Sequence, residues 1–100
     1  MSPKAYFVVH GTVQGVGYRS FVRRVAIAND ICGTVRNSPN GTVEIMVEGQ
    51  EAKLLRFESQ IDIDIPNGPS VMQIEKYTEG QEGFPKHVAS HRRFLIIGEE

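Results

Sequence analysis

The segment HGTVQGVGYR at residues 10–19 places two glycines, Gly15 and Gly17, just before an aromatic residue and Arg19. Because glycine has no Cβ atom, a loop with two glycines can turn consecutive backbone N–H groups into one concavity and admit an anion closely. The guanidinium of Arg19 would add a planar fork of donors that matches two oxygens of a phosphoryl group. The segment therefore predicts a site for phosphate or a similar oxyanion.

The glycine spacing by itself is a weak signal. Similar pairs also mark ordinary turns between a strand and a helix. The segment lacks the Gly-Lys-Ser/Thr ending of a Walker A loop, and its spacing is not that of a dinucleotide-binding loop. From the motif alone, a phosphate site and a plain turn both stay open.

The elements on either side of this loop favour the anion site. Residues 4–13, KAYFVVHGTV, are β-branched or aromatic on both alternating faces, which is typical of a central strand. After the loop, apolar residues recur at helical spacing, and we expect a helix over residues 19–30. A helix that begins directly after the loop points its unpaired N–H groups and the positive end of its dipole at the loop.

Four further elements and one loop follow. Residues 33–48 predict a β-hairpin around the turn SPNG, and in its second strand Val43, Ile45 and Val47 alternate with polar residues and Met46. Residues 50–62 return to helical spacing. SVMQIEKY at 70–77 and RRFLII at 92–97 predict two more strands, and residues 79–90 between them are a polar loop.

The order of these elements predicts the fold class. We expect an α/β (α+β) sandwich with ferredoxin-like β-α-β-β-α-β topology, extended by a fifth strand. Its mainly antiparallel sheet of four to five strands would carry both helices on one face. The chain has 100 residues, of which 40% are hydrophobic, and this length suits one core rather than two. We therefore expect residues 1–100 to form a single domain.

Composition excludes several function classes. A net charge of −1 gives no general attraction to nucleic acid or to an anionic membrane, and no apolar run approaches the length that spans a bilayer. RNA-recognition modules share the topology, but TVEIMVEG lacks their strand aromatics. The single cysteine and the start MSPKAYFVVHG, which lacks a secretory signal, indicate a cytoplasmic protein. We expect a monomer without nucleic-acid or membrane partners.

Two longer stretches resemble the signatures of the acylphosphatase family. HGTVQGVGYRSFVRRVA is similar to the loop Gly-x-Val-Gln-Gly-Val-x-Phe-Arg and its helix, and GTVRNSPNGTVEIMVEG is similar to Gly-aromatic-Val-x-Asn-x-x-Asp/Asn-Gly-x-Val-Glu. The resemblance is close over residues 4–50. It departs from the pattern at Tyr18 and Asn40, which are mild changes, and at Thr34, where the family usually has an aromatic residue.

The resemblance implies metal-independent hydrolysis of small-molecule acyl phosphates to a carboxylate and inorganic phosphate, without a cofactor. Arg19 matches the arginine that binds the phosphoryl group, and Asn37 matches the asparagine that positions the attacking water. The amides that hold the phosphoryl group match those of Gln14, Gly15, Val16, Gly17, Tyr18 and Arg19. This chemistry needs positioning and charge stabilisation rather than a strong acid, because a carboxylate leaves without protonation.

Metal-binding and non-catalytic functions are the alternatives. His10, His87 and His91 lack zinc-site spacing, so we interpret them as surface histidines and expect no metal. A phosphate- or anion-binding regulatory module would keep the loop but would not need Asn37. A domain like the acylphosphatase-like N-terminal part of the hydrogenase maturation carbamoyltransferase would usually have proline in place of Ser20 and belong to a much longer chain.

Overall fold

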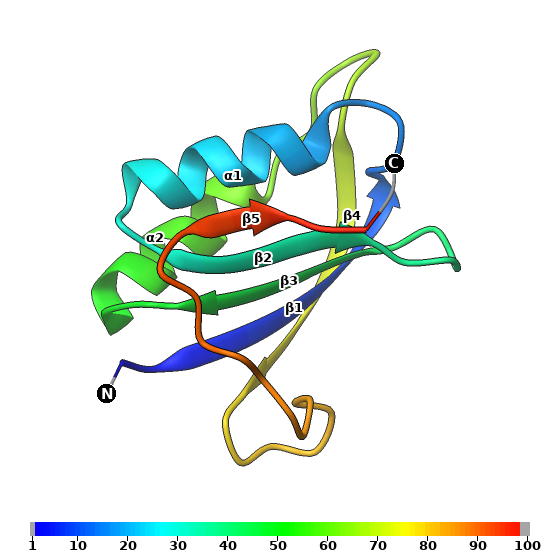
Figure 1. The fold of residues 1–100 in the computed structure, drawn as a ribbon. Coiled ribbons are helices and arrows are strands. Elements are labelled where there is room, and N and C mark those ends of the chain that lie inside the picture. Colours follow the sequence, from blue (N-terminus) through cyan, green and yellow to red (C-terminus); the bar gives the residue numbers. More distant parts are fainter. Residues whose placement is uncertain (1, 99–100) are drawn as a thin grey trace.

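The computed structural model describes residues 2–98, and its elements follow the predicted order (Figure 1). Neither helix in this part of the chain is long and apolar enough to cross a membrane. In sequence order the elements are β1 (Lys4–Thr12), α1 (Tyr18–Ala28), β2 (Cys32–Asn37), β3 (Val43–Glu48), α2 (Glu51–Ile61), β4 (Ser70–Thr78) and β5 (Phe94–Ile96).

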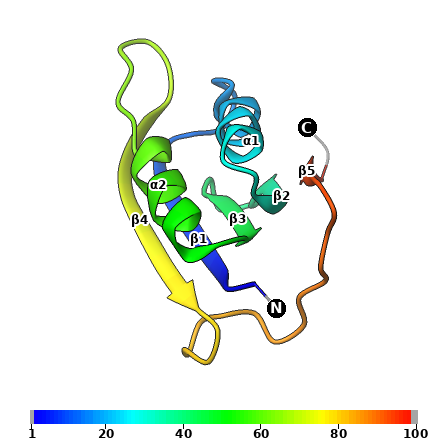
Figure 2. The same ribbon diagram turned by 90° about the vertical axis from the view of Figure 1, so that its left-hand side faces the viewer.

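The five strands form one mixed sheet in the order β4-β1-β3-β2-β5. All neighbours are antiparallel except β5, which pairs parallel with β2 and sets Gly33 opposite Phe94. Both helices lie on the same side of the sheet, and the segment after β4 passes along the other side (Figure 2). The predicted ferredoxin-like fold is therefore confirmed, with β5 as the fifth strand at one edge.

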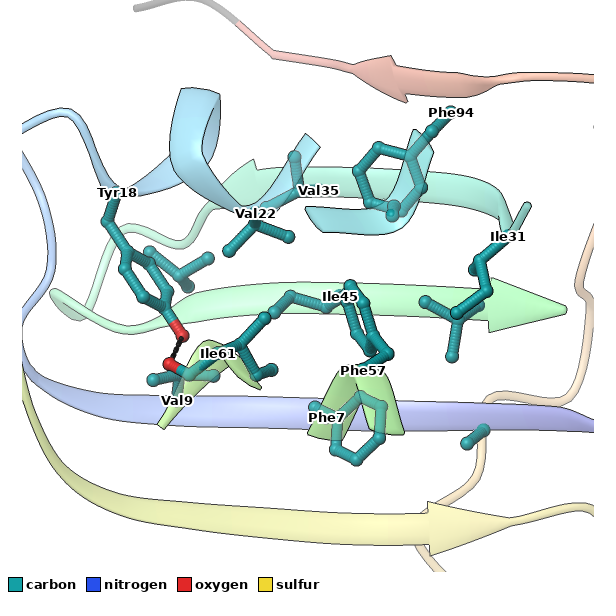
Figure 3. Packing of buried hydrophobic residues seen from close by; sticks show 14 of the residues in the cluster. Phe7, Val9, Tyr18, Val22, Ile31, Val35, Ile45, Phe57, Ile61 and Phe94 are labelled. Carbon is teal, nitrogen blue, oxygen red and sulfur yellow. Dashed lines mark hydrogen bonds between the residues drawn. The ribbon is translucent and has the colours of Figure 1, made fainter. Parts of the chain in front are cut away.

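The core lies between the sheet and the two helices (Figure 3). The predicted inward residues of β3, Val43, Ile45 and Val47, are fully buried. Phe57 of α2 packs between two other aromatic rings, with centroid distances of 6.1 Å to Phe7 and 6.5 Å to Phe94. Because this core joins β1, β5 and both helices, it holds the end of β1 and the start of α1 in a defined position.

The first helix ends at Ala28, two residues before the predicted end at residue 30. The Asn29 side chain donates from Nδ2 to the Val25 carbonyl oxygen at 2.9 Å, and Asp30 has a left-handed φ of 60°. These two polar residues end the helix by bonding to its last turn and reversing the chain. Gly33 follows as the second residue of β2, where the next strand was expected to begin.

The predicted loop 79–90 runs across the face of the sheet that carries no helix. It helps to enclose a cavity of about 230 Å³ together with Tyr6, Thr34 and Met46. Thr34 and Met46 are directly opposite each other on β2 and β3. Thr34, which stands where the family usually has an aromatic residue, therefore lies on the sheet face opposite to the helices.

Candidate active site

Residues 13–17, here called the cradle loop, connect β1 to α1. Gly15 and Gly17 have φ values of 77° and 81°, which L-residues adopt only with strain. A Cβ atom built on either glycine would meet no other atom within 4 Å. Both glycines are therefore required by the backbone turn, and the space next to them is open to solvent and to a ligand.

The side chain of Gln14 fastens the cradle loop to the turn between β2 and β3. Its Nε2 donates to the carbonyl oxygens of Ser38 and Thr42, each at 2.8 Å. Val13 is buried beside it, and Val16 packs against the core. Residues 13, 14 and 16 thus fix the loop, while its glycines stay exposed. The motif predicted a role only for the backbone amide of Gln14 and gave no sign of these side-chain bonds.

No side chain caps the backbone N–H groups in the first turn of α1, which adjoins the cradle loop. Gly17 is the N-cap residue and supplies no side-chain hydrogen bond, and no acidic residue lies in the first turn. Backbone N–H groups at such an end, with the positive pole of the helix dipole, bind anions. Arg19 lies in this turn, is partly exposed, and takes part in none of the ion pairs found within residues 2–98.

Asn37 is the last residue of β2 and lies on the helix side of the sheet. Strand alternation puts its side chain on the same face as Gly33 and Val35, which are buried under α1. Its Oδ1 atom is buried and is the one such side-chain atom without a hydrogen-bond partner in the described chain. A buried acceptor without a partner costs about 1–3 kcal/mol. Such an atom calls for an explanation, and a water that donates to it is one.

The fold brings Asn37 and the cradle loop to the same end of the sheet. The last strand residue, Asn37, precedes Ser38, whose carbonyl oxygen is held by Gln14. Figure 1 shows β2 ending beside the start of α1. Gln14 of the first motif therefore lies close to Asn37 of the second, although α1 and most of β2 separate them along the chain. Backbone amides, a guanidinium and a side-chain amide at this end of the sheet are groups that suit the binding of an oxyanion and a water.

Tyr18 has a role that the sequence did not reveal. Its ring is buried and its hydroxyl donates to the carbonyl oxygen of Ile61 at 2.9 Å (Figure 3). Burial, with a smaller contribution from the Asp62 carboxylate, raises the pKa of Tyr18 above its usual range. The hydroxyl thus stays neutral and pairs one of the last carbonyls of α2, which fixes the start of α1 against the end of α2.

We expect Tyr18→Phe to lower the free energy of unfolding by about 1 kcal/mol, because a buried donor is removed. The raised pKa adds a pH signature. Above pH ~10 the unfolded tyrosine ionises while the folded one does not, so stability falls with rising pH, and this fall should be smaller in the variant. Denaturant unfolding at pH 7 and pH 11 measures both effects. Tyr77→Phe, which removes a hydroxyl bonded to Glu75 near the surface, is the control and should lose less.

Arg36, His10 and Arg23 have partners elsewhere in the fold. Arg36 pairs with Glu44 at 2.8 Å on the helix-free face, and His10 contacts Glu75 at 3.1 Å on the same face. Arg23 donates from Nε to the carbonyl oxygen of Phe94 at 3.1 Å. Thr34 does not line the site. Of Arg19, Arg23 and Arg36, Arg19 is therefore the one that lies in the helix turn next to the cradle loop.

Comparison with known proteins identifies similar chains over most of this sequence. The family model described as acylphosphatase matches residues 5–89. An acylphosphatase from Moorella thermoacetica is 54% identical over 54 residues, which are 54% of this chain and 58% of the relative. One from Synechococcus is 37% identical over 76 residues, covering 76% of this chain and 80% of the relative.

A solved structure is similar over nearly its whole length. The crystal structure of acylphosphatase from Bacillus subtilis has a TM-score of 0.78 and 31% sequence identity to this chain, and covers 96% of this chain and 99% of its own. By contrast, this chain spans 58% of the length of the Moorella relative. The fold is thus shared with the Bacillus subtilis acylphosphatase.

Proposed function

Because this chain belongs to the acylphosphatase family, we propose that it hydrolyses acyl phosphates to a carboxylate and inorganic phosphate. The observation that carries the proposal is the position of Asn37. Its unpartnered, buried Oδ1 lies at the same end of the sheet as the glycine loop and the uncapped start of α1. A site that only bound phosphate would not need this amide.

In the proposed mechanism the cradle loop binds the phosphoryl group of the substrate. The backbone amides of residues 14–19 donate to its oxygens, and the guanidinium of Arg19 pairs with two of them. Charge on these oxygens is spread over a loose transition state, and donors that are already in place stabilise it without reorganisation. The anchoring of the loop by Gln14 and Tyr18 supports this preorganisation.

Asn37 orients the attacking water in this scheme. One O–H of the water donates to Oδ1, which turns an oxygen lone pair toward phosphorus in line with the leaving carboxylate. The P–O bond to the acyl group breaks as the bond to water forms. The carboxylate departs with the bonding electrons, and both protons of the water remain on the phosphate. A protein acid or base is not required because the leaving group is a stable anion.

Arg19 and the amides supply the positive charge in this scheme, so we expect no requirement for a metal. We further propose that residues 1–100 act as one domain and as a cytoplasmic monomer on a small-molecule substrate. The single cysteine and the near-zero net charge support this setting.

Steady-state hydrolysis of benzoyl phosphate in the presence of a chelator tests the function. Turnover that survives chelation is the expected result. A folded protein that turns over nothing, but is protected by inorganic phosphate against thermal unfolding, would instead indicate a phosphate-binding regulatory module.

Gln14→Ala should damage activity through the position of the cradle loop. The change removes two hydrogen bonds, while the carbonyls of Ser38 and Thr42 keep their backbone partners Gly41 and Ser38. At about 0.5–1.5 kcal/mol for each bond, we expect a loss of about 1–3 kcal/mol of stability. We also expect a fall of about tenfold or more in kcat/KM, because small shifts in positioning are costly. Gln73→Ala, an exposed glutamine on β4, is the matched control. Unchanged kcat/KM in Gln14→Ala would show that the clamp is dispensable.

A further inference from the structure

Three arginines from distant parts of the chain surround a cavity of about 280 Å³ at the edge of the sheet. Arg23 comes from α1, and Arg92 and Arg93 come from the segment just before β5. Figures 1 and 2 show α1 and β5 side by side. Neither the family signatures nor the proposed reaction uses Arg92 or Arg93.

The charge around this cavity is mostly uncompensated. None of these three arginines takes part in the ion pairs found within residues 2–98. One carboxylate, that of Asp30, also lines the cavity, but its Oδ2 is 3.4 Å from Nζ of Lys53. An excess of guanidinium groups around one hollow attracts phosphate or carboxylate groups, with which arginine makes paired hydrogen bonds.

Two of the arginines are anchored to the sheet. Arg23 donates from Nε to the carbonyl oxygen of Phe94 at 3.1 Å, which leaves the terminal nitrogens of its guanidinium for a ligand. The carbonyl oxygen of Arg93 accepts from the Gly33 amide at 3.0 Å. The Arg93 bond fixes the backbone beside the cavity, whereas the Arg23 bond fixes a guanidinium, which then loses less freedom on binding, and this raises affinity.

The remaining wall of the cavity is apolar and consists of Ile27, Ile31, Cys32 and Phe94. Ile27 is 54% exposed although it is a large apolar residue, and Ile31 lies beside it in the lining. An inorganic ion would leave this surface in water. A ligand with both an anionic group and an apolar or flat ring would cover it and also stack against a guanidinium.

We propose that this cavity, here called the arginine pocket, binds a small organic phosphate, and that it is separate from the cradle loop. Along α1, Ile27 is about 12 Å beyond Arg19, from a rise of about 1.5 Å per residue. Along β2, Cys32 at the pocket is about 16 Å from Asn37, from a rise of about 3.3 Å per residue. One ligand of this size therefore does not occupy both places.

A backbone-amide NMR titration with adenosine monophosphate as the probe tests the proposal. It is done with wild-type protein and with Arg19→Ala, in which phosphate binding at the cradle loop is weakened. In both proteins we expect saturable shifts at Ile27, Ile31 and Phe94. Adenosine, which lacks the phosphate, should shift none of them, and inorganic phosphate should bind more weakly because it does not cover the isoleucines.

Exposed arginines provide the variants. Arg92→Gln and Arg93→Gln should each raise the dissociation constant at least about fivefold, because each removes a charged donor. Arg24→Gln on α1, which does not line the cavity, should leave it unchanged. Shifts confined to residues 14–19, no saturable shifts at all, or equal weakening by Arg24→Gln would each overturn the proposal. Equal binding of inorganic phosphate would also overturn it. Because the readout is binding at named amides, the result is independent of hydrolysis.

Discussion

Arg19→Ala should lower kcat/KM for an acyl phosphate by about a thousandfold or more. The guanidinium is partly exposed, makes none of the ion pairs in the described chain, and lies in the first turn of α1 beside the cradle loop. Removing an arginine that neutralises a transferring phosphoryl group costs about 10³-fold or more in rate. Because the contact exists with both the substrate and the transition state, KM should rise and kcat should fall together.

The fold should tolerate this change, which makes the result interpretable. Arg19 is not part of the core, so we expect the free energy of unfolding to change by less than about 0.5 kcal/mol. Arg24→Ala on the same helix is the matched control and should retain activity. Arg19→Lys should recover only part of the loss, since a single ammonium lacks the planar fork. A fully active, folded Arg19→Ala would exclude Arg19 from phosphate binding.

Asn37→Ala should lower kcat by about a hundredfold while KM stays within about twofold. The proposed contact of Asn37 is with water rather than with the phosphoryl group, so its loss weakens the orientation of the nucleophile and spares substrate binding. Steady-state kinetics with benzoyl phosphate, combined with the affinity for inorganic phosphate as a product, measures the two effects separately. The contrast with Arg19→Ala, in which binding itself fails, is the diagnostic feature.

The stability of this variant adds an independent test. Asn37 Oδ1 is buried without a partner, so removing it also removes a desolvation cost. We therefore expect the free energy of unfolding to fall by no more than about 1 kcal/mol. If Asn37→Ala kept full activity, Asn37 would not position the water. If it instead unfolded the protein, the role of Asn37 would be structural.

The order of elements and the turn of the cradle loop could be predicted from local sequence because their causes are local. In β3 a period of two separates Val43, Ile45 and Val47 from the polar face, and all three are buried as predicted. The positive φ angles of Gly15 and Gly17 follow from the residue type that tolerates them. The predicted end of α1 was wrong by two residues. The helix is ended by a bond from the side chain of Asn29 to the Val25 carbonyl, and helical periodicity does not reveal such a bond.

What the sequence by itself determined is which residues could bind an oxyanion and which elements carry them. Only the tertiary structure decided that β2 ends, at Asn37, beside the cradle loop. It alone showed that the side chain of Gln14 links the two motifs and that the hydroxyl of Tyr18 donates to the carbonyl oxygen of Ile61. It also decided that β5 pairs with β2, which brings Arg92 and Arg93 to Arg23. These are contacts between residues far apart in the chain, and they depend on how the strands pair, which periodicity within one segment does not encode.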